Sequence, residues 1–176
     1  VVAGCGGGQA IAERLPDILQ RSAHLILDAD GLNALAADEG LKTLLRLRGA
    51  GKPTVLTPHP LEAARLLGIS TAQVQSDRLK SAQRIADLFS CVVVLKGSGS
   101  IVAAPDHLPV INTTGNGRLA TGGTGDVLAG LVGARMAQGM NAWDATCAAV
   151  HQHGLIADQW PADKGLTAQH LALQIQ

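Results

Sequence analysis

Continuous apolar runs alternate with longer amphipathic segments along the chain. An unbroken aliphatic run of a few residues predicts a strand that is buried on both faces. Four segments contain such a run: 1–4, 24–30, 53–60 and 91–100. Between and after them, apolar residues recur at helical spacing. This spacing predicts helices near 9–20, 31–38, 41–48, 60–67, 76–89, 124–138, 142–159 and 167–175.

The alternation of these elements predicts an α/β domain with a mostly parallel sheet. Two further apolar stretches, 100–105 and 108–114, predict a hairpin pair or two short strands. Pro16 lies inside the first predicted helix and is expected to bend it. Ser76 and Asp77 are expected to cap the helix 76–89.

The composition suits one domain with an aliphatic core. The 176 residues are 47% hydrophobic but only 2% aromatic, so alanine and aliphatic side chains must fill the interior. Fourteen Lys and Arg balance 14 Asp and Glu, which leaves no basic field to bind nucleic acid. No apolar run reaches the length of about 18 residues that a membrane span needs. We therefore expect a single domain over 1–176 with neither nucleic acid nor membrane as a partner.

The cysteines indicate a reducing environment. Cys5, Cys91 and Cys147 are odd in number and widely spaced, which fits neither a disulfide framework nor a zinc site. Cys91 and Cys147 lie in apolar stretches and are expected to be small core residues. We expect a cytoplasmic protein and assign no metal ligands.

Glycine-rich and polar segments follow each of the four predicted strands. In a parallel α/β sheet, ligands bind beyond the carboxyl ends of the strands. The segments in question are 4–8, 28–30, 57–59 and 96–99. Their shared position predicts a ligand site at that edge of the sheet.

The stretch TGGTGD, residues 121–126, comes directly before a predicted helix. A helix N-terminus presents unpaired amides and partial positive charge, and glycines let the backbone curl around an anion. Asp126 in the first turn would then lie beside a bound phosphate, where it can accept a proton from an attacking hydroxyl. The alternative is a glycine-rich loop in which Thr124 or Asp126 only caps the helix. The spacing alone favours neither.

Other features are ambiguous by themselves. No Walker A motif is present, and GCGGGQ (4–9) has Gln9 where the last glycine of a Rossmann fingerprint belongs. Lys96 at a strand end indicates a nucleotide contact or, more often, a solvated lysine. His151 and His153 point to different sides of a helix, so we expect one to be a packed histidine near the nucleotide helix. We interpret Asp28 as structural and leave the role of Asp30 open.

Several segments together carry a family resemblance. They are AGCGGG (3–8), LDADGLN (27–33), TPHPLEAARLLG (57–68), VVLKGSGSIVA (93–103), NTTGNGRLATGGTGDVLAG (112–130) and AVHQHGLIAD (149–158). In this order they resemble the ADP-dependent NAD(P)H-hydrate dehydratases, a branch of the ribokinase-like superfamily. The resemblance spans essentially the whole chain, and the pairing of TPHP-E with ATGGTGD is its most specific part.

The resemblance implies a fold and a repair reaction. The fold is a three-layer α/β/α sandwich around a mostly parallel central sheet. The reaction removes water from hydrated NADH or NADPH and restores the reduced cofactor. It is coupled to ADP, or to ATP as in eukaryotic members, with Mg²⁺ bound to the nucleotide. The resemblance also implies a homo-oligomer, with a tetramer as the expected form.

Motif by motif, the resemblance implies roles for particular residues. Asp126 is the implied catalytic base or hydroxyl-binding acid, and the amides of Gly123 and Gly125 form an anion hole. His59, Gly6 and Gly8 contact the hydrated dinucleotide, together with Asp126. Asn33 and Glu62 support the site or its metal waters. The implied nucleotide-binding residues are Lys96, Gly97, Ser98, Gly99, Ser100, Asn116, Gly117, Arg118, Leu119, Ala120, Thr121, Gly122, Gly123, Thr124 and Gly125.

The chain also departs from the family pattern. The first glycine turn usually reads G-P-G-L-G, whereas here it is Gly4-Cys5-Gly6-Gly7-Gly8. Family members begin well before Val1, so we expect an N-terminally incomplete domain with little activity of its own. A small-molecule kinase acting on a vitamin precursor or sugar is the alternative enzyme. A nucleotide-binding module without turnover is the non-enzymatic alternative.

Overall fold

The computed structural model describes residues 1–49 and 51–175. A six-stranded sheet runs through its centre in the spatial order β1-β2-β3-β4-β5-β6. β1 to β4 are parallel, whereas β5 pairs antiparallel with both β4 and β6. The strands are β1 (Val2–Ala3), β2 (Leu25–Leu27), β3 (Thr54–Leu56), β4 (Val92–Leu95), β5 (Ile101–Ala103) and β6 (Val110–Ile111). The mostly parallel sheet and the hairpin expected near 100–114 are both confirmed.

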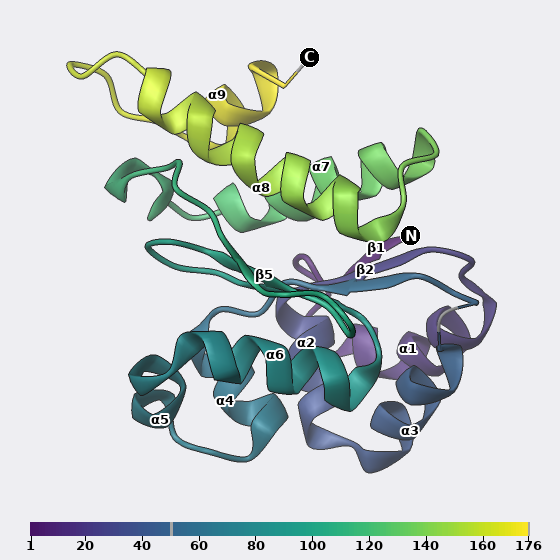
Figure 1. The fold of residues 1–176 in the computed structure, drawn as a ribbon. Coiled ribbons are helices and arrows are strands. Elements are labelled where there is room, and N and C mark those ends of the chain that lie inside the picture. Colours follow the sequence, from purple (N-terminus) through teal and green to yellow (C-terminus); the bar gives the residue numbers. More distant parts are fainter. Residues whose placement is uncertain (50, 176) are drawn as a thin grey trace.

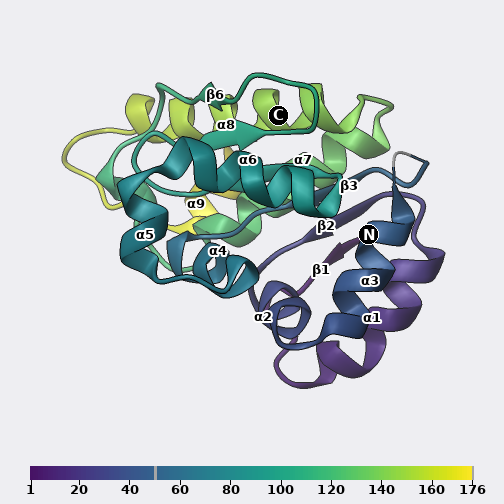
Figure 2. The same ribbon diagram turned by 60° about the horizontal axis from the view of Figure 1, so that its bottom comes forward.

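Helices cover both faces of the sheet and complete three layers (Figure 1). One layer holds α1 (Ala10–Arg21), α2 (Ala29–Ala37), α3 (Glu39–Arg48), α4 (Pro60–Leu67), α5 (Thr71–Ser76) and α6 (Arg78–Phe89). The other holds α7 (Thr124–Ala137), α8 (Ala142–Gln159) and α9 (Ala168–Leu173). A short 3-10 turn, η1 (Gly117–Leu119), precedes α7. Figure 2 shows β1 at one edge of the sheet, close to the N-terminus.

The central strands β2, β3 and β4 are almost entirely apolar because each face of the sheet contributes to a separate core. Leu25 and Leu27 pack into the core beneath α1–α6, whereas Ile26 between them packs against the α7–α8 layer. Successive side chains of a strand point to opposite faces, so burial on both sides requires an unbroken aliphatic run. No helix among the described residues is long and apolar enough to cross a membrane.

Most predicted helices are confirmed within a few residues, but the segment 71–89 differs. The structure has two helices there, because Asp77 accepts a hydrogen bond from the Lys80 amide and starts α6. The preceding α5 begins at Ser70 with a capping box to Gln73, and the sequence analysis missed it. The first helix, α1, continues through Pro16.

Candidate functional site

The N-terminus of α7 is open at its amide end. Gly123 precedes the helix with φ of +86°, and no side chain of the described residues caps it. The Thr124 hydroxyl instead donates back into the preceding loop, to the carbonyls of Leu119 (2.7 Å) and Thr121 (2.9 Å). Asp126 lies exposed in the first turn. The structure therefore removes the interpretation that Thr124 or Asp126 merely caps this helix, and leaves amides that suit an anion.

His153 fixes α8 against this helix end. Its Nε2 lies 2.8 Å from the Thr124 carbonyl, so that nitrogen carries the proton and donates. Burial lowers the pKa of His153, which keeps the ring neutral. His151 is exposed on another side of α8. The expectation of one packed histidine near this helix is confirmed, and it is His153.

A cavity of about 560 Å³ opens beside the α7 N-terminus. It is bounded by the turn after β4, the loop before α7, and the facing side of α8. Eleven of the implied nucleotide-binding residues line it: Lys96, Gly97, Ser98, Gly99, Ser100, Asn116, Gly117, Leu119, Ala120, Thr124 and Gly125. The other four, Arg118, Thr121, Gly122 and Gly123, lie in the same loop without lining the cavity.

The sequence analysis missed seven lining residues. They are Asn112, Thr114, Gly115, Leu128, Val150, His153 and Gly154. The Thr114 hydroxyl donates to the His151 carbonyl at 2.9 Å, which ties the loop to α8. A Cβ on Gly154 would lie 2.3 Å from the Thr114 Oγ1 atom, so only glycine permits this contact. An isolated glycine inside the predicted helix 142–159 was the signal for such a close approach.

Lys96 and Asp28 form a buried ion pair under the cavity. The Lys96 Nζ atom donates to the Asp28 carboxylate at 2.7 Å, and the Asp28 side chain is 1% exposed. Asp28 precedes α2 but its side chain makes no capping hydrogen bond. A Cβ on Gly125 would lie 3.3 Å from the Lys96 Nζ atom. Asp28 therefore does not cap α2, and the Lys96 ammonium is ion-paired rather than solvated at an exposed turn.

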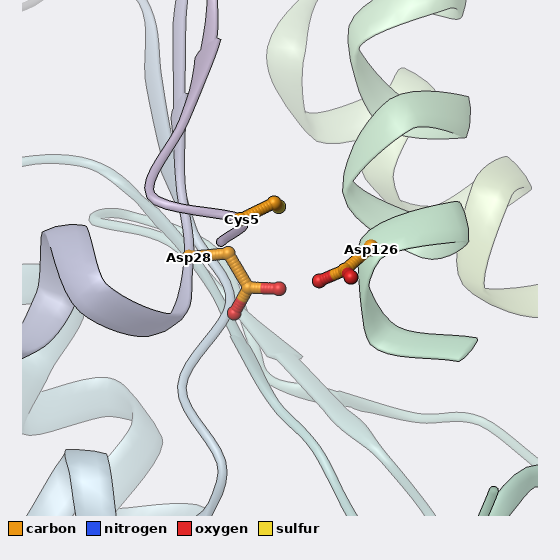
Figure 3. A group of neighbouring side chains, drawn as sticks. All are labelled: Cys5, Asp28 and Asp126. Atoms are coloured by element: carbon orange, nitrogen blue, oxygen red, sulfur yellow. The ribbon is translucent and has the colours of Figure 1, made fainter. Parts of the chain in front are cut away.

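Cys5 joins this pair to Asp126. The Sγ atom of Cys5 and carboxylate oxygens of Asp28 and Asp126 all lie within 4.8 Å of one another (Figure 3). Burial, and then the two carboxylates, raise the pKa of Cys5 to about 12. In the absence of a cation the thiol is therefore protonated near neutral pH and can donate a hydrogen bond.

The first glycine turn lies outside the cavity. Gly6 and Gly8 are exposed, with φ of +68° and +53°. The Gly8 amide, implied as a substrate contact, already donates to the Asp30 carboxylate at 2.8 Å. This bond gives Asp30 a role that the sequence left open, because it orders the turn that leads from Cys5 toward α1.

His59 caps α4 as part of a reciprocal capping box. Its Nδ1 atom accepts from the Leu61 amide at 3.1 Å, while the Glu62 carboxylate accepts from the His59 amide at 2.8 Å. Burial raises the pKa of Glu62. The His59 side chain stays 45% exposed, so part of its ring faces solvent. The Asn33 side chain is also engaged, because it accepts from Arg65 at 2.6 Å.

The turn that carries His59 lies next to Lys96. The Lys96 amide donates to the Pro58 carbonyl at 2.9 Å. His59, Asp28 and Lys96 thus belong to the carboxyl ends of three neighbouring parallel strands. The structure brings these residues and Asp126 to the carboxyl end of the parallel strands, whereas the Asn33 side chain is bonded to Arg65 and the Glu62 side chain to the His59 amide.

The three-layer fold and the open helix end at the carboxyl edge of its sheet define a ribokinase-like protein. Within that class, residues 1–176 match the family model described as NAD(P)H-hydrate dehydratase, and the chain belongs to this family. It is 43% identical to the ADP-dependent (S)-NAD(P)H-hydrate dehydratase of Neisseria meningitidis serogroup B, over 99% of this chain and 59% of that protein. It is 42% identical to a bifunctional NAD(P)H-hydrate repair enzyme of Escherichia coli, over 86% of this chain and 28% of that one.

Solved structures agree with this assignment. The ADP/ATP-dependent NAD(P)H-hydrate dehydratase of Bacillus subtilis, co-crystallised with ATP and Mg²⁺, aligns with a TM-score of 0.77 at 31% identity. That alignment covers 97% of this chain and 60% of the Bacillus chain. A pyridoxal kinase of Staphylococcus aureus aligns with a TM-score of 0.65 at 17% identity, which concerns the fold alone. The chain thus spans about three fifths of the length of the Neisseria protein and the Bacillus chain.

Proposed function

We propose that this chain forms the nucleotide-binding and catalytic part of an ADP-dependent (S)-NAD(P)H-hydrate dehydratase. One observation carries the proposal: Thr124 and Gly125 at the α7 N-terminus line the cavity beside the turn after β4, and the next residue, Asp126, carries an exposed carboxylate in the same helical turn. The named relatives in Neisseria and Bacillus support the choice of reaction. The vitamin-kinase alternative gains no separate support, since the kinase likeness concerns the fold alone.

The chemistry explains why a kinase-like fold suits a dehydratase. Hydroxide is a poor leaving group, whereas phosphate is a good one. In the proposed reaction, Asp126 accepts the proton of the hydrate hydroxyl, and the hydroxyl oxygen bonds to the terminal phosphorus of the nucleotide. The bond from that phosphorus to its bridging oxygen breaks in the same step and releases the shortened nucleotide, which is AMP when ADP is the donor. The ring nitrogen then donates its electron pair, the carbon–oxygen bond breaks, and phosphate leaves. Loss of the ring proton at the neighbouring carbon restores the dihydronicotinamide.

The proposal assigns the surrounding residues by their positions. The turn Lys96–Ser100 and the loop Asn116–Gly125 bind the nucleotide, with the amides of Gly123 and Gly125 directed at its phosphates. Gly6, Gly8 and the exposed part of His59 contact the hydrated dinucleotide. The Gly8 amide is occupied by Asp30, so its contact would come through the Cα and carbonyl of the turn.

Mg²⁺ fits this site as a companion of the nucleotide. It prefers oxygen ligands and keeps several of its waters. Asp126 is exposed and available, but Asp28 is paired with Lys96 and the Cys5 thiol is protonated. Since Asp126 is the available carboxylate, a cation here would be held mainly by the phosphate oxygens of the nucleotide. The cation would neutralise part of the phosphate charge. We further propose a cytoplasmic homo-oligomer, with a tetramer as the form to test first.

The deciding experiment separates turnover from binding. Asp126→Asn should lower the ADP-dependent dehydration of hydrated NADH by about 10³-fold, in the range typical of a lost general base, while ADP affinity changes little. Loss of hydrated NADH is followed by the return of absorbance of the reduced cofactor, and ADP binding by calorimetry. Asp17→Asn is the matched control, because Asp17 is an exposed carboxylate on α1 away from the cavity.

Three results would contradict the proposal. Full turnover in Asp126→Asn would remove the assigned base. Binding of ADP by a wild-type protein that turns over no hydrate would instead favour the nucleotide-binding module, and phosphorylation of a vitamin alcohol would favour the kinase.

A further inference from the structure

We propose that Arg78 is a positioning residue for nucleotide binding, acting through the turn Lys96–Ser100. This inference rests on the proposed function, because it concerns how the same cavity is shaped. Arg78 is the first residue of α6 and does not line the cavity itself. Its guanidinium contacts the backbone of the turn, whose residues line the cavity.

The guanidinium binds three backbone carbonyls, one at the end of β4 and two in the turn. Its Nη1 atom donates to the Ser98 carbonyl at 2.5 Å. Its Nη2 atom donates to the carbonyls of Leu95 at 3.2 Å and Lys96 at 3.5 Å. A planar fork of donors fixes both the direction and the curvature of the backbone that it binds. Arg78 thus links the end of β4 to the residues that face the cavity.

Gly97 shows that the turn and the guanidinium are fitted to each other. Gly97 has φ of +148°, and a Cβ on it would lie 2.8 Å from the Arg78 Nη2 atom. A side chain at this position would displace the guanidinium or the turn. The absence of a side chain at Gly97 therefore leaves room for the guanidinium of Arg78 behind the turn.

The remaining contacts of the turn involve Lys96, Gly97 and Ser100 rather than Ser98. The Ser100 hydroxyl donates to the Gly97 carbonyl at 3.1 Å and accepts from the Gly97 amide at 3.3 Å. The Lys96 amide bonds to Pro58, as described above. Arg78 is thus the contact that ties Ser98, at the tip of the turn, to a helix.

The guanidinium of Arg78 loses part of its hydration and has, in the described part of the chain, no acidic partner to compensate for that loss. Burial lowers the pKa of its guanidinium, its Nε atom is buried without a hydrogen-bond partner, and no carboxylate among the described residues pairs with it. An arginine kept only for stability would gain from an acidic partner. The uncompensated charge beside the turn favours an anion in the cavity, where Lys96 is already neutralised by Asp28.

The test compares Arg78→Met and Arg78→Lys with Arg84→Met, which removes an exposed arginine from the same helix. Calorimetry with ADP and Mg²⁺ should show a dissociation constant about tenfold higher or more in Arg78→Met, as expected when charge-assisted hydrogen bonds are lost. KM for ADP should rise in parallel while kcat stays within about twofold. Arg78→Lys keeps the charge but not the fork, and should fall between Arg78→Met and wild type.

The outcomes are distinguishable. Unchanged ADP affinity in folded Arg78→Met, or a lower kcat at unchanged KM, would overturn the inference. If Arg78→Met does not fold by circular dichroism, Arg78→Lys decides by the same two readouts. If the wild-type protein binds no ADP, both the proposed function and this inference are contradicted. If Arg78→Met binds ADP with the affinity of the wild-type protein, only this inference is contradicted.

Discussion

Asp28 holds its carboxylate where only 1% of the residue reaches solvent, and Lys96 is the group that permits this. Two charges that leave water lose much of their hydration, so their attraction repays the cost only when both partners are present. The Lys96 side chain is 20% exposed, so it retains some access to water. The two partners should therefore respond unequally to substitution.

We predict that Lys96→Met destabilises the protein by about 3–5 kcal/mol, because it strands the Asp28 charge. Asp28→Asn should cost less, and the double variant should be more stable than Lys96→Met alone. Urea unfolding of the four proteins completes the cycle. Lys42→Met is the control, since its partner Glu39 is largely exposed and the pair should contribute no more than about 1 kcal/mol. Strictly additive effects at Lys96 and Asp28 would contradict the prediction.

At the scale of single residues, the sequence predicted the positions of residues whose surroundings are set by their neighbours along the chain. Thr124 and Asp126 lie in a local pattern with three glycines, so their place at a helix N-terminus could be read directly. The pairing of Asp28 with Lys96 could not, because the two are 68 residues apart and meet only through the order of the strands. An aspartate that directly precedes a helix has the same sequence pattern whether its carboxylate is buried in an ion pair or caps the helix at the surface.

At the level of elements, the contact between α8 and the loop before α7 sets the width of the cavity. Gly154 in α8 lies against Thr114, and its neighbour His153 bonds to the first residue of α7. A methyl group on Gly154 would meet the Thr114 backbone carbonyl at 2.7 Å as well as its hydroxyl. Backbone atoms cannot swing aside as a flexible side chain would, so the loop itself would have to move.

We predict that Gly154→Ala weakens ADP binding by about tenfold or more and costs about 1–3 kcal/mol of stability, because the overpacked loop shifts away from α8. Gly130→Ala in α7 is the matched control: that glycine is exposed, and a Cβ on it would meet nothing within 4 Å. This control should leave binding unchanged and raise stability by a few tenths of a kcal/mol up to about 1 kcal/mol. Calorimetry with ADP and urea unfolding measure both quantities. Equal affinity in Gly154→Ala and wild type would show that the loop position does not shape the site.

A helix or strand was easier to predict when more of its residues were apolar and followed a regular spacing. The parallel strands β2, β3 and β4 stand out because all their residues are buried, and α7 and α8 stand out because they are long. α5 was missed because its six residues bury only one side chain, Val74. The lining residues of α8 were missed for a different reason: which face of a long helix meets a loop is decided by tertiary packing, not by the helix's own periodicity.

At the scale of the whole molecule, the sheet separates two cores, and the cysteines are spread between them. Cys91 packs in the core beneath α1–α6, whereas Cys5 and Cys147 pack against the α7–α8 core. Burial raises the pKa of all three thiols above their ordinary value of 9.0, to about 12 for Cys5. Unfolding exposes all three together, so their titrations affect the stability of the entire domain.

The sign of the effect follows from proton binding. Above about pH 9 the unfolded chain loses its thiol protons while the folded protein keeps them, so the free energy of unfolding falls as pH rises. The stabilisation is complete below pH 9 and is lost progressively as pH rises toward 12, the pKa of Cys5. Each thiol contributes a slope of up to about 1.4 kcal/mol per pH unit in that window.

We predict that Cys91→Ala flattens this decline, because it removes one of the three titrating thiols. Urea unfolding at a series of pH values from 8 to 11 gives the slope for each protein. Val93→Ala is the control: Val93 is buried in the same core as Cys91, so its loss should lower stability equally at every pH and leave the slope unchanged. Parallel curves for Cys91→Ala and wild type would mean that the Cys91 thiol ionises no later in the folded protein than in the unfolded chain. The loss of stability at alkaline pH would then have to come from other groups. A flattened curve would instead show that part of this loss comes from the burial of the Cys91 thiol in the aliphatic core.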